Sequence, residues 1–208
     1  LPIYGLDLRL VSDDLKNNRE VVKIAVQQNG AALEFASPAL RDDREIVRTA
    51  ISQNGWELQY ASAALQNDKE LVKFAVEKNG YALKFASSAL RNDPEVVRLA
   101  VQKHGWALEH ASSERRDDAE IVKIAVNQHG PAIEFASDNL KNNLEVVKLA
   151  VTQNALALMF ASDELQSNID LLKYALQRDG MVLAIIPPEV QTRELVEIAV
   201  KQDGKALR

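Results

Sequence analysis

An Asn-Gly dipeptide, or a close variant of it, returns along this chain with a period of 25 residues. The series runs through Asn29-Gly30, Asn54-Gly55, Asn79-Gly80, His104-Gly105, His129-Gly130, Asn154-Ala155, Asp179-Gly180 and, one residue early, Asp203-Gly204. Regular self-similarity of this kind is typical of repeat architectures, in which each copy packs only against its neighbours. The period therefore constrains the fold before any single residue is given a role.

Each copy of the repeat predicts two short α-helices, as residues 30–54 illustrate. The first covers about 31–37, and Ser37-Pro38 after it predicts an N-cap and a first-turn proline for one further short turn. The second covers about 43–53, and its equivalent in the preceding repeat is apolar over most of its circumference. Because helices this short do not persist alone in water, we expect the repeats to fold only as an array.

The turn glycine is expected to end the second helix in the left-handed C′ conformation, which glycine adopts without a Cβ penalty. His104 and His129 hold the asparagine position of this turn, where we expect a C-cap role. Ala155 lacks the freedom of glycine, so we expect this joint to be strained by about 1–2 kcal/mol or to be continuous helix. The interval before Asp203 is one residue shorter than the period, so we expect the last repeat to drift from the regular pattern.

The sequence thus predicts an all-α fold, a right-handed α-solenoid of about eight 25-residue two-helix repeats, as a single domain over residues 1–208. A closed ring or a long coiled coil are the alternatives, and short glycine-terminated helices without heptads disfavour the coil. Neither end carries a polar capping repeat. We therefore expect a piece of a longer array or multidomain protein, with end-to-end self-association through its uncapped terminal repeats.

Composition disfavours several classes of function. The sequence contains no cysteine, so disulfides and thiolate metal sites are excluded, and the cytoplasm or another reducing compartment is compatible. No run of residues approaches the roughly 18 apolar residues that span a bilayer, and we expect no membrane insertion. A net charge of −5 disfavours binding to nucleic acid or to anionic lipid.

The repeat resembles an uncharacterised family. Its pattern, NGxALxxASxxLRxDxEVVxxAVxxNG, is followed almost throughout by residues 79–105, NGYALKFASSALRNDPEVVRLAVQKHG, and is similar to the helical repeat catalogued as domain of unknown function 4116. The resemblance implies tandem arrays in large protist proteins and in proteins of intracellular bacteria, some of them effector-like. A bacterial effector fragment that reaches a host cytosol is therefore one expectation. The resemblance supplies no catalytic residue, and it implies that an aromatic residue after the glycine is a common family choice.

Two positions of the repeat are candidates for contact with a partner. The position after the turn glycine holds Ala31, Trp56, Tyr81, Trp106, Pro131, Leu156, Met181 and Lys205. The position three residues later holds Glu34, Gln59, Lys84, Glu109, Glu134, Met159 and Ala184. Tryptophan and tyrosine dominate binding hot spots, which favours a peptide-binding strip on the concave side of the array. The predicted strip consists of Trp56, Gln59, Tyr81, Lys84, Trp106 and Glu109. The alternative is that the rings staple neighbouring helices and that the polar position merely tolerates solvent.

Charged residues also recur with the period. On the second helix, acids stand three residues before bases, the arrangement of a solvated salt-bridge face. These pairs are Glu20/Lys23, Glu45/Arg48, Glu70/Lys73, Glu95/Arg98, Glu120/Lys123, Glu145/Lys148 and Asp170/Lys173. A second basic set lies in the turns without so regular an acid and is the only hint of phosphate contact. This set is Lys16, Arg41, Arg91, Arg116 and Lys141. The hint is weakened by four nearby acids, Asp42, Asp43, Asp117 and Asp118.

One repeat departs from the pattern at three positions. An aromatic series expected in the core comprises Phe35, Tyr60, Phe85, Phe135 and Phe160, and His110 interrupts it. Arg115 interrupts a leucine series, and Glu114 replaces a usual alanine. Because polar groups in a core need partners, we expect a local network of His110 with Glu114 or Arg115. We interpret this irregular repeat as a tolerated structural defect, and a binding pocket or a kink is the alternative.

Nothing in the sequence indicates catalysis. The three histidines lack metal-ligand spacing, no phosphate loop or nucleophile motif is present, and paired carboxylates recur in every repeat. We therefore expect no enzyme activity, no cofactor and no metal site. The expected function is a non-catalytic repeat scaffold that presents an extended surface to a protein or peptide. The alternatives are a modular nucleic-acid-binding repeat array and an inert structural spacer in a larger effector or enzyme.

Overall fold

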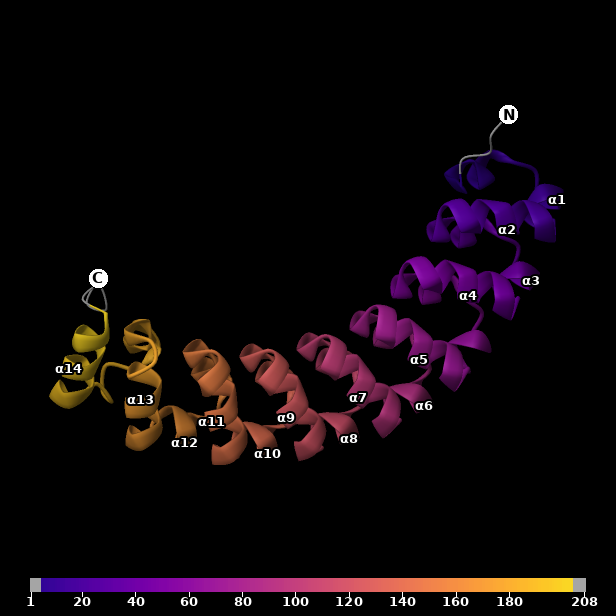
Figure 1. Cartoon of the computed structure of the whole chain (residues 1–208). Helices are drawn as coiled ribbons and strands as arrows, with labels where there is room; N and C mark the ends of the chain where they lie inside the picture. The colour runs from indigo at the N-terminus through magenta and orange to yellow at the C-terminus, as the bar shows by residue number, and fades with distance from the viewer. Residues whose placement is uncertain (1–4, 204–208) are drawn as a thin grey trace. The chain divides into compact units, whose positions relative to one another are not determined.

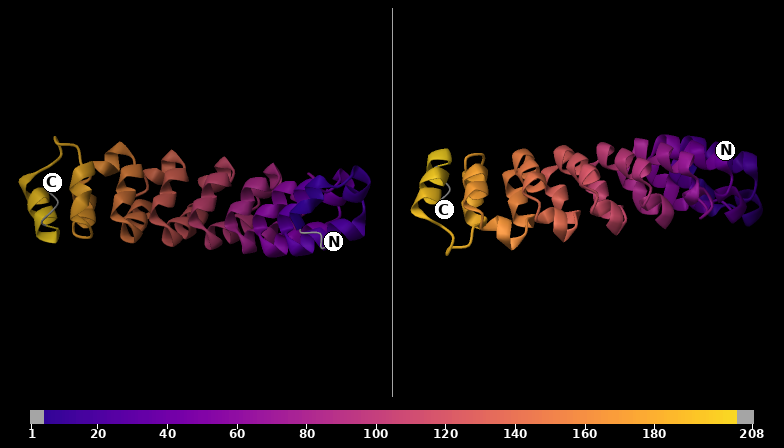
Figure 2. Two further views of the ribbon diagram at one scale, coloured as in Figure 1. Left: turned by 90° about the horizontal axis from the view of Figure 1, so that it is seen from above. Right: turned by 90° about the horizontal axis from the view of Figure 1, so that it is seen from below.

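The computed structural model describes residues 5–203, and every regular element in that range is a helix (Figure 1). The chain forms two compact units, Leu1–Ser112 and Ser113–Arg208, and each is described by itself. Within each unit, successive long helices pack side by side in chain order, and so do the 3-10 helices (Figure 2). The helical solenoid predicted from the sequence is confirmed.

Most repeats contain three helical segments: a 3-10 helix of six residues, an α-helix of four, and a longer α-helix of ten. The 3-10 helices are η1 (Gly5–Leu10), η2 (Gly30–Phe35), η3 (Gly55–Tyr60), η5 (Gly80–Phe85), η6 (Gly105–His110), η7 (Gly130–Phe135), η8 (Ala155–Phe160) and η9 (Gly180–Ile185). The short segments are α1 (Asp13–Lys16), α3 (Pro38–Arg41), η4 (Leu65–Asn67), α6 (Ser88–Arg91), α8 (Ser113–Arg116), α10 (Asp138–Lys141) and α12 (Asp163–Gln166). The long helices are α2 (Arg19–Gln28), α4 (Arg44–Gln53), α5 (Lys69–Lys78), α7 (Pro94–Lys103), α9 (Ala119–Gln128), α11 (Leu144–Gln153), α13 (Ile169–Leu176) and α14 (Arg193–Gln202).

The first segment of the repeat is a 3-10 helix, and not the α-helix expected over 31–37, because both of its ends are fixed within six residues. Asn29 Oδ1 accepts a hydrogen bond from the Ala31 N–H at 3.0 Å. At the other end, the Ala36 N–H donates to the Leu33 carbonyl at 3.1 Å, and Ala36 has extended backbone. The tighter 3-10 geometry suits a piece this short.

Polar side chains start the two α-helical segments. The Ser37 hydroxyl accepts a hydrogen bond from the Leu40 N–H at 3.4 Å, and Pro38 lies in the first turn of α3, as predicted. Asp43 accepts hydrogen bonds from two backbone N–H groups at the start of α4. Each long helix is capped in this way by an asparagine, aspartate or threonine side chain. The start of each helix is therefore encoded locally.

The turn glycine has a different role from the expected one. No glycine in the described range has a positive φ, so the left-handed conformation predicted for it is wrong. The long helix α4 ends before Asn54, which is extended with φ −153°, and Gly55 begins the next 3-10 helix. A Cβ on Gly55 would lie 2.3 Å from the carbonyl oxygen of Ala75 in the following repeat. Glycine suits this position because it allows two backbones to approach closely.

Ala155 causes neither the strain nor the continuous helix that was expected. Helix η8 begins at Ala155, and Asn154 has φ −153° and ψ 115°, close to the values of Asn54. The irregularity lies in the next long helix, since α13 has eight residues where α11 has ten. After it, the Arg178 N–H donates to the Ala175 carbonyl at 3.0 Å, a tighter turn than an α-helix. The long helix that follows Ala155 is therefore shorter than the other long helices of the described range.

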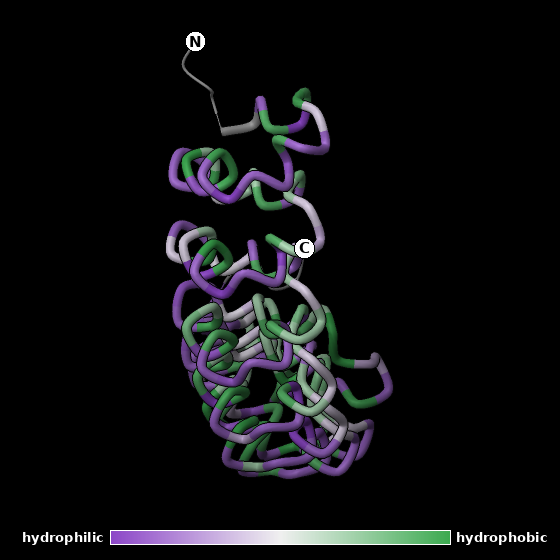
Figure 3. Tube along the Cα trace, turned by 90° about the vertical axis from the view of Figure 1, so that its right-hand side faces the viewer, coloured by the Kyte–Doolittle hydropathy of each residue, from purple (hydrophilic) through white to green (hydrophobic). Residues whose placement is uncertain are grey.

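The core of both units is aliphatic. In the repeat 30–54, Leu33 on η2 and Ile46 and Val47 on α4 have no exposed surface. Hydrophobic and hydrophilic stretches alternate along the repeats (Figure 3). The aromatic series that the sequence analysis placed in the core is only partly buried, at Phe35, Tyr60, Phe85, Phe135 and Phe160 alike. That prediction is wrong because the series occupies the last residue of each 3-10 helix, at the edge of the stack.

A backbone ladder ties each repeat to the preceding one. The Ser37 N–H donates to the Lys16 carbonyl at 2.9 Å, and the Ser137 N–H donates to the Arg116 carbonyl at the same distance in the C-terminal unit. The Ser37 hydroxyl also donates to Asn17 Oδ1 at 2.7 Å. The recurrent serine therefore both caps a helix and joins two repeats.

The last repeat differs from the others, in agreement with the predicted drift. Where the other repeats have a short helix, it has a turn in which the Val190 N–H donates to the Pro187 carbonyl at 2.9 Å. Thr192 then caps α14 through its side chain. Gly204 and Lys205, which extend the periodic series, lie outside the described residues.

Candidate partner-binding surface

The predicted binding strip lies on three 3-10 helices of the N-terminal unit. Helix η3 carries Trp56 and Gln59, η5 carries Tyr81 and Lys84, and η6 carries Trp106 and Glu109. None of the six is buried: Lys84 and Glu109 are exposed, and the others are partly exposed. Residues i and i+3 eclipse each other in a 3-10 helix, so each ring shares a side of its helix with one polar residue. Since η3, η5 and η6 pack in succession, three ring–polar pairs stand on adjacent helices.

The rings also contact the next repeat. Trp56 meets Phe85 edge-on, with 5.2 Å between ring centroids. Tyr81 stacks on His104 at 5.0 Å and meets His110 edge-on at 6.4 Å. Such pairs contribute about 0.5–1.5 kcal/mol beyond the burial of their area. The rings therefore staple neighbouring repeats and still keep part of their surface in solvent.

His104 and His129 occupy the C-cap positions of α7 and α9, as the period predicts. Neither side chain caps the following 3-10 helix, which is what asparagine does at this position. His104 Nδ1 instead accepts a hydrogen bond from the Gly80 N–H at 3.0 Å, so this nitrogen carries no proton. Burial and, to a lesser extent, the charge of Lys103 lower the pKa of His104, which favours the neutral ring.

The histidine of the irregular repeat lies in the N-terminal unit. His110 is partly exposed and faces the edge of Tyr81. Burial lowers its pKa, Glu109 opposes this shift, and Lys84 and Arg91 add to it. Because the whole aromatic series is partly exposed, a histidine needs no buried polar network at this position.

The other two irregular residues lie in the C-terminal unit. Arg115 holds a position at which Leu140 and Leu165 are buried. Its guanidinium forms ion pairs with Glu114 and with Asp118, the latter at 3.1 Å. Asp118 also caps α9, and it was not part of the network expected from the sequence. The charge of Arg115 is thus paired at the start of a long helix.

The charged face predicted from i, i+3 spacing pairs mainly between repeats. Lys73 lies 3.7 Å from Glu70 on its own helix but 2.6 Å from Glu95 in the next repeat. In the C-terminal unit, Lys123 likewise lies 2.9 Å from Glu145 of the next repeat. The sequence spacing indicated the correct residue types, and the stacking of helices decides which of them meet.

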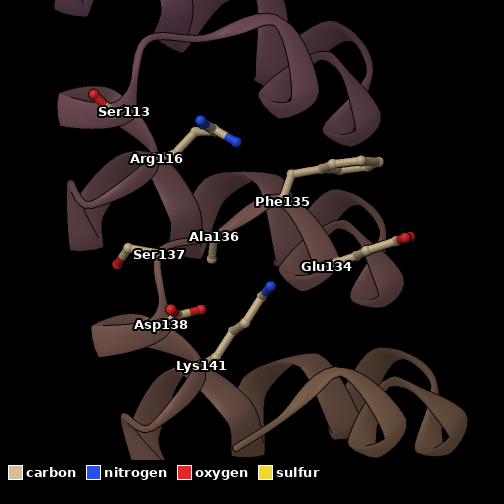
Figure 4. A pocket seen from close by; sticks show the side chains of 8 residues that line it. All are labelled: Ser113, Arg116, Glu134, Phe135, Ala136, Ser137, Asp138 and Lys141. Atoms are coloured by element: carbon tan, nitrogen blue, oxygen red, sulfur yellow. The ribbon is translucent and has the colours of Figure 1, made fainter.

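Two members of the second basic set, Arg116 and Lys141, border cavities that the sequence did not predict. A cavity of about 400 Å³ is lined by Arg116 from α8, Lys141 from α10 and Phe135 from η7 (Figure 4). A second cavity of about 470 Å³ lies one repeat further on, with Lys141, Met159 and Phe160 in its lining. The only sequence signal was the recurrence of a cation at the end of the short segment.

The described residues contain no cluster of three or more side chains suited to a metal ion. No helix within 5–203 has both the length and the apolar character needed to cross a membrane.

Comparison with protein families agrees with the repeat structure. The model of a domain of unknown function (DUF4116) matches residues 1–41, 28–66, 43–91, 68–116, 118–166 and 143–191 in tandem. Neither the curated proteins nor the solved structures gave a match. Since these matches cover far more than half of the sequence, the chain belongs to the DUF4116 repeat family.

Proposed function

We propose that the chain is a non-catalytic repeat scaffold that presents an extended surface to a protein or peptide partner. The observation that carries this proposal is the contrast between a constant framework and a variable surface. The capping asparagines, serines and aspartates recur in nearly every repeat and bond to backbone. The partly exposed strip, in contrast, changes from Trp56/Gln59 to Tyr81/Lys84 to Trp106/Glu109.

The residue types of the strip suit recognition of a peptide. Trp and Tyr supply large contact areas with few rotatable bonds, and they are enriched in binding hot spots. The adjacent polar residues are neutral, basic and acidic in turn, so successive repeats offer different chemistry at the same geometric position. A preformed scaffold of this kind loses little conformational entropy when it binds.

The ionisable groups of the long helices are occupied by structural tasks, which supports a role without catalysis. Asp43 caps α4 and forms an ion pair with Arg19 at 2.8 Å. Asp93 caps α7 and forms an ion pair with Lys69, also at 2.8 Å. Carboxylates held in this way serve every repeat equally, as structural residues do and a single active site does not.

The proposal is tested by selecting peptides from a displayed random library with the full chain and measuring their Kd. In one variant, Gln59→Ala, Lys84→Ala and Glu109→Ala are combined, because these side chains have no large packing role. A second variant combines Trp56→Ala, Tyr81→Ala and Trp106→Ala. The matched control changes exposed residues of the long helices, Glu77→Ala, Lys103→Ala and Gln128→Ala.

We expect both strip variants to weaken binding by at least about tenfold, which corresponds to roughly 1.4 kcal/mol, while the control binds as the wild type does. Circular dichroism verifies that each variant remains folded. Selection of no peptide, or equal binding by all variants, contradicts the proposal and favours a spacer. Affinity only for single-stranded RNA, falling steeply with salt, favours the nucleic-acid alternative.

A further inference from the structure

Four basic side chains at one position of the repeat lack the acidic partner that many other cations of the chain have. They are Arg41, Arg91, Arg116 and Lys141, the last residues of α3, α6, α8 and α10. All four are partly exposed. Across the described part of the chain, none of them forms an ion pair or a side-chain hydrogen bond.

Each of the three arginines of this set has a buried N–H donor that lacks a hydrogen-bond acceptor within residues 5–203. The Nε atoms of Arg41, Arg91 and Arg116 are buried without a hydrogen-bond partner among the described residues. Burial of part of a charged group without a partner is unfavourable, so an anion that pairs with the exposed part of the same guanidinium would be favoured.

In other repeats, the side chain at this position forms hydrogen bonds within its own repeat. Gln66 holds it in the third repeat, and its Nε2 donates to the Leu58 carbonyl at 3.2 Å. Gln166 holds it further on, and its Nε2 donates to the Met159 carbonyl at 3.0 Å. Glutamine therefore bonds to the end of its own 3-10 helix, whereas the four cations remain available.

The acids next in sequence to Arg41 and Arg116 form no ion pair with them in the described part of the chain, and their carboxylates accept hydrogen bonds from serines instead. Asp42 follows Arg41 and accepts a hydrogen bond from the Ser62 hydroxyl of the next repeat. Asp117 follows Arg116 and accepts one from Ser137 in the same way. In the sequence these aspartates weakened the case for an anion site, but in the structure both accept hydrogen bonds from the recurrent serine of the next repeat.

Two of the cations, Arg116 and Lys141, line cavities that a peptide could enter. In Figure 4, the Arg116 and Lys141 side chains extend from successive short helices toward the same space, beside the ring of Phe135. Glu134 and Asp138 also line this cavity of about 400 Å³. The site thus combines two cations, an aromatic wall and two acids at its border.

We propose that these cavities bind the carboxylates of an acidic, extended peptide segment. This inference rests on the proposed scaffold function and adds the chemistry of the partner. Guanidinium groups match carboxylates in shape and charge, and the backbone N–H groups of a peptide can donate to Glu134 and Asp138. A continuous phosphate backbone would bring negative charge against both acids.

The spacing of the repeats predicts the pattern of the peptide. Stacked helices lie about 8–10 Å apart, and an extended chain advances about 3.3 Å per residue. Acidic residues three positions apart in the peptide therefore reach Arg116 and Lys141, which lie on successive repeats of the C-terminal unit.

The test uses the full chain and a fluorescein-labelled synthetic peptide with glutamate at every third position. A matched peptide has glutamine instead, and a labelled single-stranded RNA serves as a further probe. The variant combines Arg116→Gln and Lys141→Gln, because the chain itself uses glutamine at 66, 166 and 191. The control combines Lys103→Gln and Lys201→Gln, which are exposed and remove the same charge at positions where other repeats also carry glutamine.

We expect the glutamate peptide to bind the wild type and the control, and to bind the Arg116/Lys141 variant at least about tenfold more weakly, as loss of charged hydrogen bonds predicts. The glutamine peptide should bind all three proteins weakly. Equal affinity of the two peptides, or equal losses in variant and control, overturns the inference. RNA binding that depends on Arg116 and Lys141, without peptide binding, overturns it in favour of a polyanion.

Failure of this inference is distinguishable from failure of the scaffold function. Neutral peptides that bind through Trp56, Tyr81 and Trp106, and that bind the Arg116/Lys141 variant equally well, leave the scaffold function intact and overturn the acidic-peptide site. If no peptide of any composition binds the full chain, both fail.

Discussion

Gly55 and Ala75 approach so closely that a Cβ at position 55 would lie 2.3 Å from the Ala75 carbonyl oxygen. Gly80 has the same relationship to Ala100 of the following repeat, at 2.4 Å. The obstacle in each case is backbone and cannot rotate away, as the end of a side chain could. The periodic glycine therefore sets how closely two repeats stack.

Replacement of Gly55 by alanine is expected to lower the free energy of unfolding by about 1–3 kcal/mol, the usual cost of overpacking a close contact. Urea titration followed by circular dichroism measures this loss. Ser88→Ala, at an exposed position on α6, serves as the control and should change stability little. Unchanged stability of the Gly55 variant would show that the close approach does not depend on glycine.

Glu57 is an unpaired acid at a position that is alanine in most other repeats. Glu57 is only 9% exposed, and its Oε2 atom has no hydrogen-bond partner among the described residues. Glu57→Ala is expected to raise the free energy of unfolding at neutral pH by about 1–3 kcal/mol, because it removes a buried polar group that lacks a partner. Glu77→Ala removes an equal charge from an exposed position and serves as the control.

The effect of Glu57 should depend on pH in a defined direction. Burial and, secondly, the charge of Glu34 raise its pKa, so the folded protein holds this proton more tightly than the unfolded chain does. The wild type therefore loses stability as pH rises from the unfolded pKa of about 4.3 through the raised folded pKa. The difference between Glu57→Ala and wild type should grow over this range. A difference independent of pH would contradict the buried-acid explanation.

Asp93 has two roles that can be separated. It caps α7 and forms an ion pair with Lys69 at 2.8 Å. Asp93→Asn retains the cap, as Asn143 does for α11, and should cost less than about 1 kcal/mol because the pair is partly exposed to solvent. Asp93→Ala removes the cap as well and should cost about 0.5–2 kcal/mol. Equal losses in the two variants would mean that the ion pair, and not the cap, stabilises α7.

Acid pH should weaken the same contact. Burial favours the protonated form of Asp93, but hydrogen bonds from Lys69 and from the Val96 N–H outweigh it, so the pKa of Asp93 lies below its usual value. The resulting stability is present above the unfolded pKa of about 3.9 and is lost as pH falls through the folded value. In urea titrations across this range, the wild type should lose more stability than Asp93→Ala. The reverse order would contradict the lowered pKa.

The irregular repeat offers a test of whether it is a defect. His110→Phe together with Arg115→Leu restores both series of the pattern, although Arg115→Leu also leaves Asp118 without its ion pair. If the irregularity is a tolerated defect, the double variant should have a Tm several degrees higher, equivalent to about 1 kcal/mol. A lower Tm in differential scanning calorimetry would contradict this interpretation.

Local signals predicted where the helices lie, although the first segment of each repeat is a 3-10 helix and not the expected α-helix. Contacts between repeats escaped prediction. Ser37 and Asp43 cap their helices through bonds to residues two or three positions away, so the sequence around them contains the whole interaction. The role of Gly55 depends on Ala75, and the partner of Lys73 depends on the position of Glu95. These relationships require the distance between two stacked repeats, which no single repeat specifies.

The candidate surfaces were predictable to the same extent. The ring positions, such as Trp56 and Tyr81, follow from the period alone. The cavity beside Arg116 did not follow from it, because Asp117 next in sequence suggested a neutralised charge. Only the structure shows that Asp117 accepts a hydrogen bond from the Ser137 hydroxyl.

His104 should make the stability of the chain sensitive to mild acid. Its Nδ1 accepts a hydrogen bond from the Gly80 N–H. Protonation of Nδ1 would place two N–H donors opposite each other and would break this bond. Since burial and Lys103 lower its pKa, stability should fall as pH drops through the unfolded value of about 6.5 toward the lower folded pKa. His104→Asn, which restores the common residue of this turn, should lose less stability over that range in urea titrations. His110 is present in both proteins, so its own titration cancels in the comparison. If both proteins lose the same stability between neutral and mildly acidic pH, the hydrogen bond to Gly80 is not the pH-sensitive contact.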